Sequence, residues 1–433
     1  TLNAISTLIL DRDTDTANQT VTRLSAFLRH VAQTSDSPLG LVIEGGEGCV
    51  VRTAGGKEYL DLLAGIGVAA LGHGNPRVLA AIREQAERHL HVMVYGELVQ
   101  EAQVRLASRL AGLLPPSLDN VYFTNSGTEG NVMALAGARV FAQRKGRTAA
   151  TKVMVFHGGY HGGVLYFVSG GSPVNMPYEY IVAPYNDIEG TRALLARHGE
   201  ELFAVLLEPM QGSHGCLPGD VAFLKMVREE TRARGITMIF DEVMTSRLSP
   251  GGLQQKLGVI PDMTTLGKYI GGGMSFGAFG VRRDIMELFD PTKPDALPHA
   301  GTFNNNVATM TAGGIVLSEV FTADRAEAHT ERGNEFRANV AALLARHKAP
   351  VSVSGFGSMM SLHGLRNAPT TPTEALQRDN DLNNLLFLGL LERGIYIAAR
   401  GMMNVGLAHT DEQLATALDR LDDLLDEIDD LVA

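Results

Sequence analysis

The middle of the chain alternates between short apolar runs and longer amphipathic segments. Short apolar runs predict strands, and segments with apolar residues three or four positions apart predict helices. The predicted strands are 121–123, 153–156, 203–207, 236–240 and 278–281, and the predicted helices between them include 128–144 and 221–234. Continuous apolar strands separated by helices are typical of a parallel sheet covered on both faces. Ligands of such sheets bind beyond the carboxyl ends of the strands, so the residues that follow each strand are candidates for a site.

The two ends of the chain have a different pattern. The elements predicted before the sheet are an amphipathic helix at 19–33, short strands with glycine turns within 40–66, and helices at 76–90 and 98–114. From about residue 311 long helices predominate, and the last begins at Thr410, with Gln413 three positions later as in a capping box. We therefore expect a large domain over 76–310 and a smaller C-terminal domain over 311–433, to which the N-terminal segment 1–75 contributes.

Composition narrows the class of protein. Of the 433 residues 45% are hydrophobic and 20% are charged, so the chain can bury a large core. A net charge of −11 disfavours a protein that binds the phosphate backbone of nucleic acids. No apolar run reaches the roughly 18 residues of a membrane span, and two cysteines cannot form a disulfide framework. We expect a cytoplasmic enzyme with no signal peptide, no membrane segment and no nucleic-acid partner.

Small and hydroxyl-bearing residues follow the strand at 121–123. Ser126, Gly127 and Thr128 stand at the start of a predicted helix, whose free N–H groups and dipole attract an anion. A capped turn without a ligand is the alternative interpretation. The segment is not a Walker loop, because no lysine follows at the G-x-x-x-x-G-K spacing.

A glycine-rich loop at 157–163 follows the strand at 153–156. Tyr160 lies among its glycines, where an aromatic side chain can stack on a flat ring. His157 and His161 of the same loop could suggest a metal site, but no cysteine or carboxylate lies close by in the sequence. We expect no metal.

Acidic and amide side chains follow the next two strands. Glu208 and Gln211 come after 203–207, where they could either face a ligand or cap a loop. Asp241 follows the apolar strand at 236–240. A buried carboxylate needs a partner, which the protonated ring nitrogen of a ligand would supply. The alternative is that Asp241 caps the next helix.

Lys268 stands between an apolar stretch and three glycines at 271–273. Glycines let a ligand approach closely, and a lysine in a partly desolvated site can lose its proton and form a Schiff base. The successive strand ends therefore supply an anion-binding helix start, an aromatic ring that can stack on a ligand, a buried acid and an amine. This set fits pyridoxal 5′-phosphate, which has a phosphate, a flat ring, a ring nitrogen and an aldehyde.

Several motifs resemble those of the class III aminotransferases, which belong to the fold-type I pyridoxal-phosphate enzymes. F-D-E-V-M-T at 240–245 and G-K-Y-I-G-G-G at 267–273 look like the glutamate-1-semialdehyde aminomutase branch. The segments 244–248, 273–278 and 301–306 are similar to β-amino-acid aminotransferases of the β-phenylalanine type. The resemblance covers nearly the whole chain. It implies an α/β fold, with a mostly parallel seven-stranded sheet in the large domain and a smaller α+β domain.

The resemblance also implies the catalytic residues. Lys268 would form the Schiff base with the cofactor and carry the proton, and Asp241 would pair with the pyridine nitrogen. Tyr160 would stack on the front of the ring, and Val243 would pack behind it.

Further residues are implied to bind the phosphate and the substrate. Ser126, Gly127 and Thr128 would hold the phosphate, together with Thr302 of the neighbouring subunit, so a homodimer with shared active sites is implied. Glu208 and Gln211 match positions near the cofactor, and Arg400 matches the arginine that binds a substrate carboxylate. The implied activity is transfer of an amino group from a β-amino acid, an ω-amino acid or an amine to a 2-oxo acid such as 2-oxoglutarate or pyruvate, in ping-pong half-reactions.

Three departures from the family pattern concern the substrate. Segment 35–50 lacks the second arginine of the β-phenylalanine type, segment 61–73 looks more like ornithine or acetylornithine aminotransferases, and Ser275 stands where the aminomutase branch has a proline. An aminomutase is the alternative within the class. A catalytically silent cofactor-binding protein is the alternative outside it, which the presence of Lys268 and Asp241 disfavours.

Overall fold

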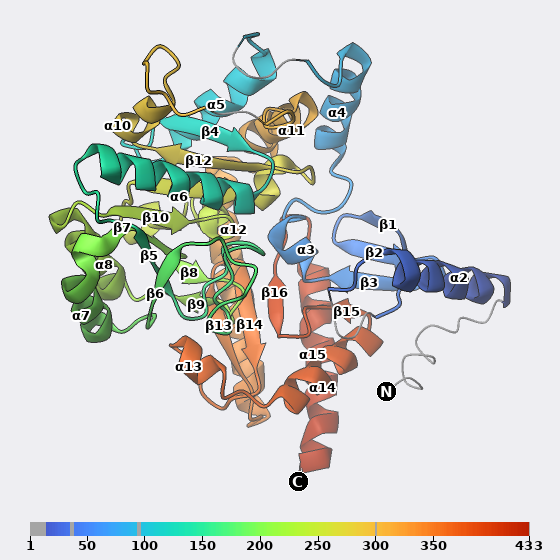
Figure 1. Cartoon of the computed structure of the whole chain (residues 1–433). Helices are drawn as coiled ribbons and strands as arrows, with labels where there is room; N and C mark the ends of the chain where they lie inside the picture. Colours follow the sequence, from blue (N-terminus) through green and yellow to red (C-terminus); the bar gives the residue numbers. More distant parts are fainter. Residues whose placement is uncertain (1–13, 35–38, 93–96, 299–300, 433) are drawn as a thin grey trace.

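A seven-stranded sheet forms the centre of the computed structural model, which describes residues 14–34, 39–92, 97–298 and 301–432 (Figure 1). β12 is antiparallel to both of its neighbours, and the other neighbouring strands are parallel. The mostly parallel sheet expected from the sequence is thus confirmed. In spatial order its strands are β4 (Asn120–Thr124), β12 (Gly277–Val281), β11 (Met263–Gly267), β10 (Thr237–Asp241), β7 (Leu202–Leu207), β5 (Lys152–Phe156) and β6 (Glu179–Ala183).

Two of these strands, β6 and β11, were not among the predicted ones. β11 carries two buried threonines whose hydroxyls are hydrogen-bonded. Thr264 Oγ1 donates to Gln254 Oε1 (2.6 Å), and Thr265 Oγ1 donates to Asn131 Oδ1 (2.8 Å). β6 lies at the edge of the sheet, with only Ala183 buried. β11 is not a continuous apolar run, which is why the apolar pattern did not reveal it. In β6, residues 180–183 are apolar, and the sequence analysis overlooked this short run.

Helices cover both faces of the sheet. Along β5, Val153 and Val155 pack in one apolar cluster with α6 (Gly127–Arg144), whereas Met154 and Phe156 pack in another with α8 (Val221–Ala233). Alternate side chains of a strand point to opposite faces, so the two helices lie on opposite sides. The other α-helices between residues 76 and 315 are α4 (Pro76–Arg88), α5 (Glu101–Leu113), α7 (Ile188–His198), α9 (Leu253–Leu257), α10 (Arg283–Met286) and α11 (Val307–Ile315).

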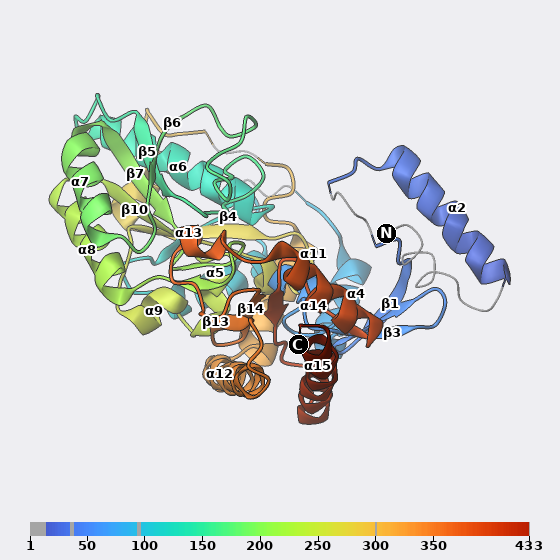
Figure 2. The ribbon, with the colours of Figure 1, turned by 90° about the horizontal axis from the view of Figure 1, so that it is seen from below.

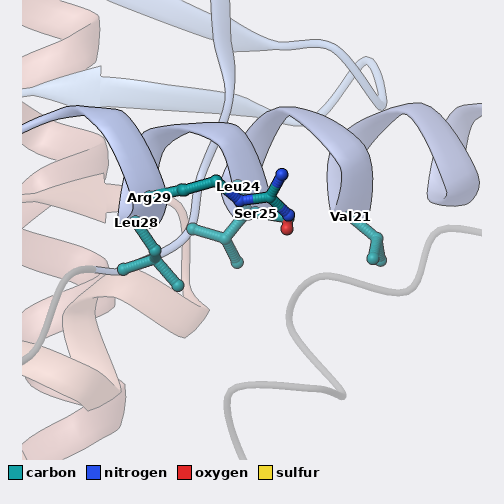
Figure 3. Close-up of a pocket in the computed structure, with 5 residues that line it drawn as sticks. All are labelled: Val21, Leu24, Ser25, Leu28 and Arg29. Carbon is teal, nitrogen blue, oxygen red and sulfur yellow. The ribbon is translucent and has the colours of Figure 1, made fainter.

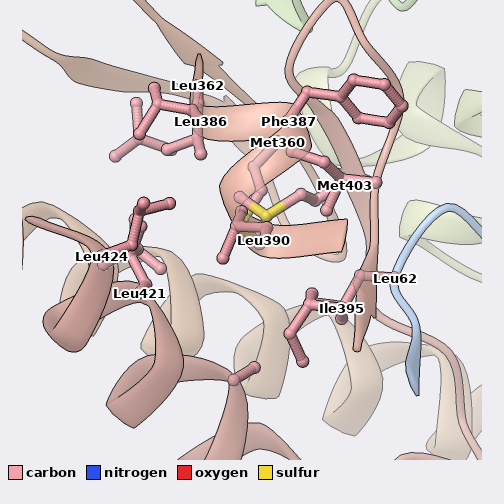
Figure 4. Close-up of a cluster of buried hydrophobic side chains, with 14 of the residues drawn as sticks. Leu62, Met360, Leu362, Leu386, Phe387, Leu390, Ile395, Met403, Leu421 and Leu424 are labelled. Carbon is pink, nitrogen blue, oxygen red and sulfur yellow. The ribbon is translucent and has the colours of Figure 1, made fainter. Parts of the chain in front are cut away.

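A separate apolar cluster joins the two ends of the chain (Figure 4). Leu62, which follows β3, packs there with Ile395 and Leu421, and β3 pairs in parallel with β15. The N-terminal strands therefore share a sheet and a core with C-terminal residues, while the domain boundaries given above stay a prediction. The elements around this cluster are β1 (Ile43–Glu47), β2 (Val50–Thr53), β3 (Glu58–Asp61), α12 (Ala323–Arg346), β13 (Ser352–Phe356), β14 (Met359–His363), α14 (Asn380–Glu392), β15 (Ile395–Tyr396), β16 (Met402–Asn404) and α15 (Asp411–Val432). Short elements elsewhere are β8 (Met210–Gln211), β9 (Leu217–Pro218) and α13 (Pro372–Ala375).

The capping box predicted for the last helix is confirmed. Thr410 Oγ1 accepts a hydrogen bond from the backbone N–H of Gln413 (3.1 Å), and the backbone N–H of Thr410 donates to Gln413 Oε1 (3.0 Å). Two N–H groups at the start of α15 are thereby satisfied.

The N-terminal helix, α2, spans Thr14–His30 rather than 19–33. In Figure 2 it extends away from the rest of the ribbon. Val21 and Leu28 are 56% and 51% exposed, and with Leu24 they line a shallow hollow on its surface (Figure 3). Within the described residues, no helix combines the length and hydropathy that a membrane crossing requires.

Candidate active site

A cavity of about 540 Å³ lies at the carboxyl ends of the central strands. Most of the residues predicted to form a site line it together, although they are spread over nearly 300 positions of sequence. The predicted residues on its wall are Ser126, Gly127, Thr128, Tyr160, Glu208, Asp241, Val243, Lys268 and Arg400.

Two predicted residues do not line this cavity. Gln211 is buried behind the glycine-rich loop, where its Nε2 donates to the carbonyl of His157 (2.8 Å). A Cβ placed on Gly158 would lie 2.7 Å from Gln211 Oε1, so the two are tightly packed. Thr302 is exposed, and its implied role in a neighbouring subunit's site stays a prediction.

The start of α6 forms one end of the cavity. Ser126 is the N-cap, and its Oγ accepts a hydrogen bond from the backbone N–H of Glu129 (3.1 Å). A Cβ on Gly127 would lie 2.6 Å from Val243 Cγ2, so only glycine lets Val243 lie against the first turn of the helix. The bare first turn, with its free N–H groups and dipole, is suited to an anionic group such as phosphate.

Asp241 ends β10 and is only 5% exposed. Its Oδ2 accepts hydrogen bonds from Asn131 Nδ2 (2.8 Å) and lies 2.9 Å from His161 Nδ1. Its Oδ1 accepts a hydrogen bond from the backbone N–H of Val243 (3.0 Å). Hydrogen bonds to a carboxylate stabilise its charged form, so this acid can face a protonated ring nitrogen.

Sequence reasoning missed Asn131 and assigned no role to His161. Asn131 is a buried polar residue on the inward face of α6, between Gly130 and Ala134, which was the available signal. His161 was considered only as a metal ligand and lies instead against Asp241. Within the part of the chain that is described, no group of three His, Cys, Asp or Glu side chains is arranged to hold a metal.

Lys268 directly follows β11 and has a positive φ of 55°. Burial lowers the pKa of its amine, Arg247 and Arg400 lower it further, and Asp241 and Glu208 oppose that change. Gly272 and Gly273 also have positive φ angles, so these glycines permit the sharp turn after the lysine. The arrangement presents an amine of reduced basicity to the cavity.

Glu208 fixes the loop that carries Tyr160. Its Oε1 accepts a hydrogen bond from the backbone N–H of Tyr160 (3.0 Å), and its Oε2 accepts one from that of Gly212 (2.9 Å). Burial raises the pKa of Glu208 to about 7, and the nearby Asp241 adds to this. Tyr160 is 38% exposed, and its ring meets that of Tyr166 edge-on, with 5.9 Å between their centroids.

Arg400 lies between β15 and β16 and lines the cavity. Among the described residues no carboxylate pairs with it. Its Nη2 contacts Met402 Sδ at 3.4 Å, and its Nε is buried without a hydrogen-bond partner. Burial lowers the pKa of this guanidinium. A half-buried donor fork of this kind matches the geometry of a carboxylate.

These residues fit the cofactor expected from the sequence. The cavity combines four features: the start of α6 at Gly127, a buried acid held by Asn131 and the Val243 backbone, an amine of lowered pKa, and an aromatic ring on a loop that Glu208 holds. Each matches one chemical group of pyridoxal 5′-phosphate.

Comparison with known proteins identifies the family of the chain. The sequence pattern of the family described as aminotransferase class-III matches residues 31–425. The chain is 43% identical over 381 residues to a β-phenylalanine transaminase of Variovorax paradoxus, covering 87% of this chain and 84% of that protein. It is 36% identical over 391 residues to a glutamate-1-semialdehyde 2,1-aminomutase of Desulforudis audaxviator, covering 86% of this chain and 88% of that protein.

The fold is similar to that of a solved structure as well. The crystal structure of a β-phenylalanine aminotransferase from Variovorax paradoxus matches with a TM-score of 0.90 and 38% identity, over 98% of this chain and 96% of that one. The fold-type I architecture and the pyridoxal 5′-phosphate cofactor are thereby confirmed. The chain belongs to the class III aminotransferases and is a pyridoxal-phosphate-dependent enzyme.

Proposed function

We propose that the enzyme transfers an amino group from a β-amino acid, or from an ω-amino acid or amine, to a 2-oxo acid such as 2-oxoglutarate or pyruvate. The observation that carries this proposal is Arg400, which lines the same cavity as Lys268. Its guanidinium is half-buried, its Nε is buried without a hydrogen-bond partner, and no carboxylate among the described residues pairs with it. A guanidinium of this kind binds the carboxylate of a substrate through charge-assisted hydrogen bonds. The likeness to a β-phenylalanine transaminase supports a β-amino acid as donor.

In this proposal the cofactor is held at three points. Ser126, Gly127 and Thr128 bind the phosphate at the start of α6, and Asp241 binds the ring nitrogen. Tyr160 and Val243 cover the two faces of the ring. When bound, the cofactor supplies an electron sink for the carbon that carries the amino group.

Lys268 attaches the cofactor and moves the proton. With its pKa lowered by burial, a larger fraction of the amine is neutral and able to accept a proton. Its Nζ would take the proton from the donor carbon and hold it within the site for return. In the second half-reaction the same steps run in reverse on the 2-oxo acid, whose carboxylate binds Arg400.

We also propose a homodimer with shared active sites. The exposed apolar side of α2 and the exposed Thr302, outside the cavity of its own chain, support this assembly. The cytoplasmic location expected from the sequence stays a prediction.

An aminomutase is the second candidate, because relatives of that activity align over most of the chain. An aminomutase returns the amine to the same carbon skeleton and needs no acceptor. The test is to incubate holoenzyme with a β-amino acid, with and without 2-oxoglutarate or pyruvate, and to identify the products. Multiple turnover only in the presence of the 2-oxo acid supports the aminotransferase; turnover of glutamate-1-semialdehyde without an acceptor would overturn it.

A further inference from the structure

A left-handed helical turn, α3 (Ala64–Gly67), forms part of the cavity wall. All four residues have positive φ angles: 52° at Ala64, 57° at Gly65, 58° at Ile66 and 81° at Gly67. This conformation is unfavourable for residues that carry a Cβ, such as Ala64 and Ile66. It persists only where the surrounding structure holds it in place.

Two buried polar residues hold the start of the turn. Asp61 Oδ1 accepts hydrogen bonds from the backbone N–H groups of Leu63 (3.0 Å) and Ala64 (2.8 Å). Asn404, from β16, donates through Nδ2 to the carbonyl of Leu63 (3.1 Å). The strained backbone is therefore tied to both β3 and β16.

Arg247 holds the end of the turn. It is 1% exposed, its Nη2 donates to Asn404 Oδ1, and its Nη1 donates to the carbonyl of Gly67 (3.5 Å). A Cβ on Gly67 would lie 2.9 Å from Nη1, so the guanidinium is packed directly against this backbone. Among the described residues Arg247 has no carboxylate partner, and a buried charge without a counter-ion is costly. Arg247 does not line the cavity, and its charge influences the pKa of Lys268 from outside it.

The turn presents apolar side chains to the site. Ile66 and, one residue beyond the turn, Val68 line the cavity that Lys268 and Arg400 also line. A donor whose carboxylate binds Arg400 would therefore share the cavity with these apolar side chains. The direction of Ile66 depends on the backbone that Arg247 holds.

We propose that Arg247 is a positioning residue that holds the left-handed turn, and that Ile66 on this turn selects ligands with an apolar side chain next to the carboxylate site. The inference rests on the proposed function, because it takes the donor carboxylate to bind Arg400. It assigns Arg247 a role in substrate selection, in addition to its effect on the pKa of Lys268.

The test compares two acids that cannot react, 3-phenylpropanoate and propanoate. Their dissociation constants for the holoenzyme are measured by calorimetry for the wild type, Ile66→Ala, Arg247→Met and Arg247→Lys. Lysine keeps the charge but cannot bond to Gly67 and Asn404 as a planar fork. Arg337→Met, at a half-buried arginine of α12 outside the cavity, is the matched control.

We expect the wild type and the control to prefer 3-phenylpropanoate. In Ile66→Ala and in both Arg247 variants, the ratio of the two dissociation constants should fall roughly tenfold. This is the size expected when a ligand loses contact with one or two methylene groups. Binding of propanoate should change little. In the Arg247 variants, hydrogen exchange of the amides at 64–69 should also become faster, while Ile66→Ala leaves Arg247 and its hydrogen bonds in place.

An unchanged preference in Ile66→Ala, or in either folded Arg247 variant, overturns the inference. So does a wild type that binds the two acids equally. Since neither acid needs to react, these outcomes are independent of donor turnover. Failure of β-amino acids to serve as donors would contradict only the proposed function.

Discussion

Asp241 receives hydrogen bonds from the Val243 backbone and from Asn131, and lies within hydrogen-bond distance of His161. We expect Asp241→Asn to keep the fold but to lose activity, because a neutral amide cannot hold a ring nitrogen protonated. A loss of ~4 kcal/mol of transition-state stabilisation slows a reaction about a thousandfold. Steady-state kinetics alongside circular dichroism check this. A folded variant with near-normal turnover contradicts the assigned role.

Arg400 should affect the two half-reactions differently. Arg400→Ala removes the only guanidinium on the described cavity wall, so KM for the 2-oxo acid should rise by about tenfold to a hundredfold, as expected for loss of a charge-assisted pair of 1.5–3 kcal/mol. A simple amine donor without a carboxylate should be nearly unaffected. Arg378→Ala, at a half-buried arginine outside the cavity wall, is the control. Equal losses with both substrates would mean that Arg400 is structural.

At the residue scale the sequence revealed groups that directly follow strands. Ser126, Asp241 and Lys268 could be predicted because parallel strands end at one edge of a sheet. Asn131 was not predicted, because its function depends on which face of α6 meets Asp241, a contact between residues 110 positions apart.

At the element scale, long apolar strands and amphipathic helices were predictable, whereas strands with hydrogen-bonded threonines were not. β11 was missed because Thr264 and Thr265 are satisfied by Gln254 and Asn131, which only the tertiary structure brings near. The left-handed turn of α3 was also beyond prediction. Its Ala64 and Ile66 have no preference for positive φ and are held there by distant residues.

The capping box of α15 gives a prediction at the same scale. Thr410→Ala removes the acceptor for the backbone N–H of Gln413, so it should lower the free energy of unfolding by about 1 kcal/mol. Urea denaturation measures this change. Thr416→Ala, within the same helix, is the matched control, because its Oγ1 only adds a hydrogen bond to the carbonyl of Glu412. Equal losses of unfolding free energy in the two variants would show that the capping hydrogen bond does not stabilise α15.

For the whole molecule, the proposed dimer places Thr302 of one subunit at the phosphate site of the other. Lys268→Ala and a Thr302→Ala variant of low activity should then complement each other when mixed. The hybrid contains one site in which both residues are intact, so activity should rise above that of either parent once subunits exchange. A fully active monomer, measured by sedimentation, contradicts shared sites.

The central claim is that this chain removes an amino group from its donor and stores it on the cofactor until a 2-oxo acid arrives. The most direct measurement is the absorbance of holoenzyme mixed with a β-amino acid alone. We predict that the absorbance of the lysine-bound cofactor bleaches by one equivalent per site, that one equivalent of carbonyl product is released, and that 2-oxoglutarate or pyruvate restores the spectrum. Lys268→Ala should show neither change. A wild-type spectrum that stays constant across β-amino acids, ω-amino acids and simple amines, in a protein that retains its cofactor, would contradict the account.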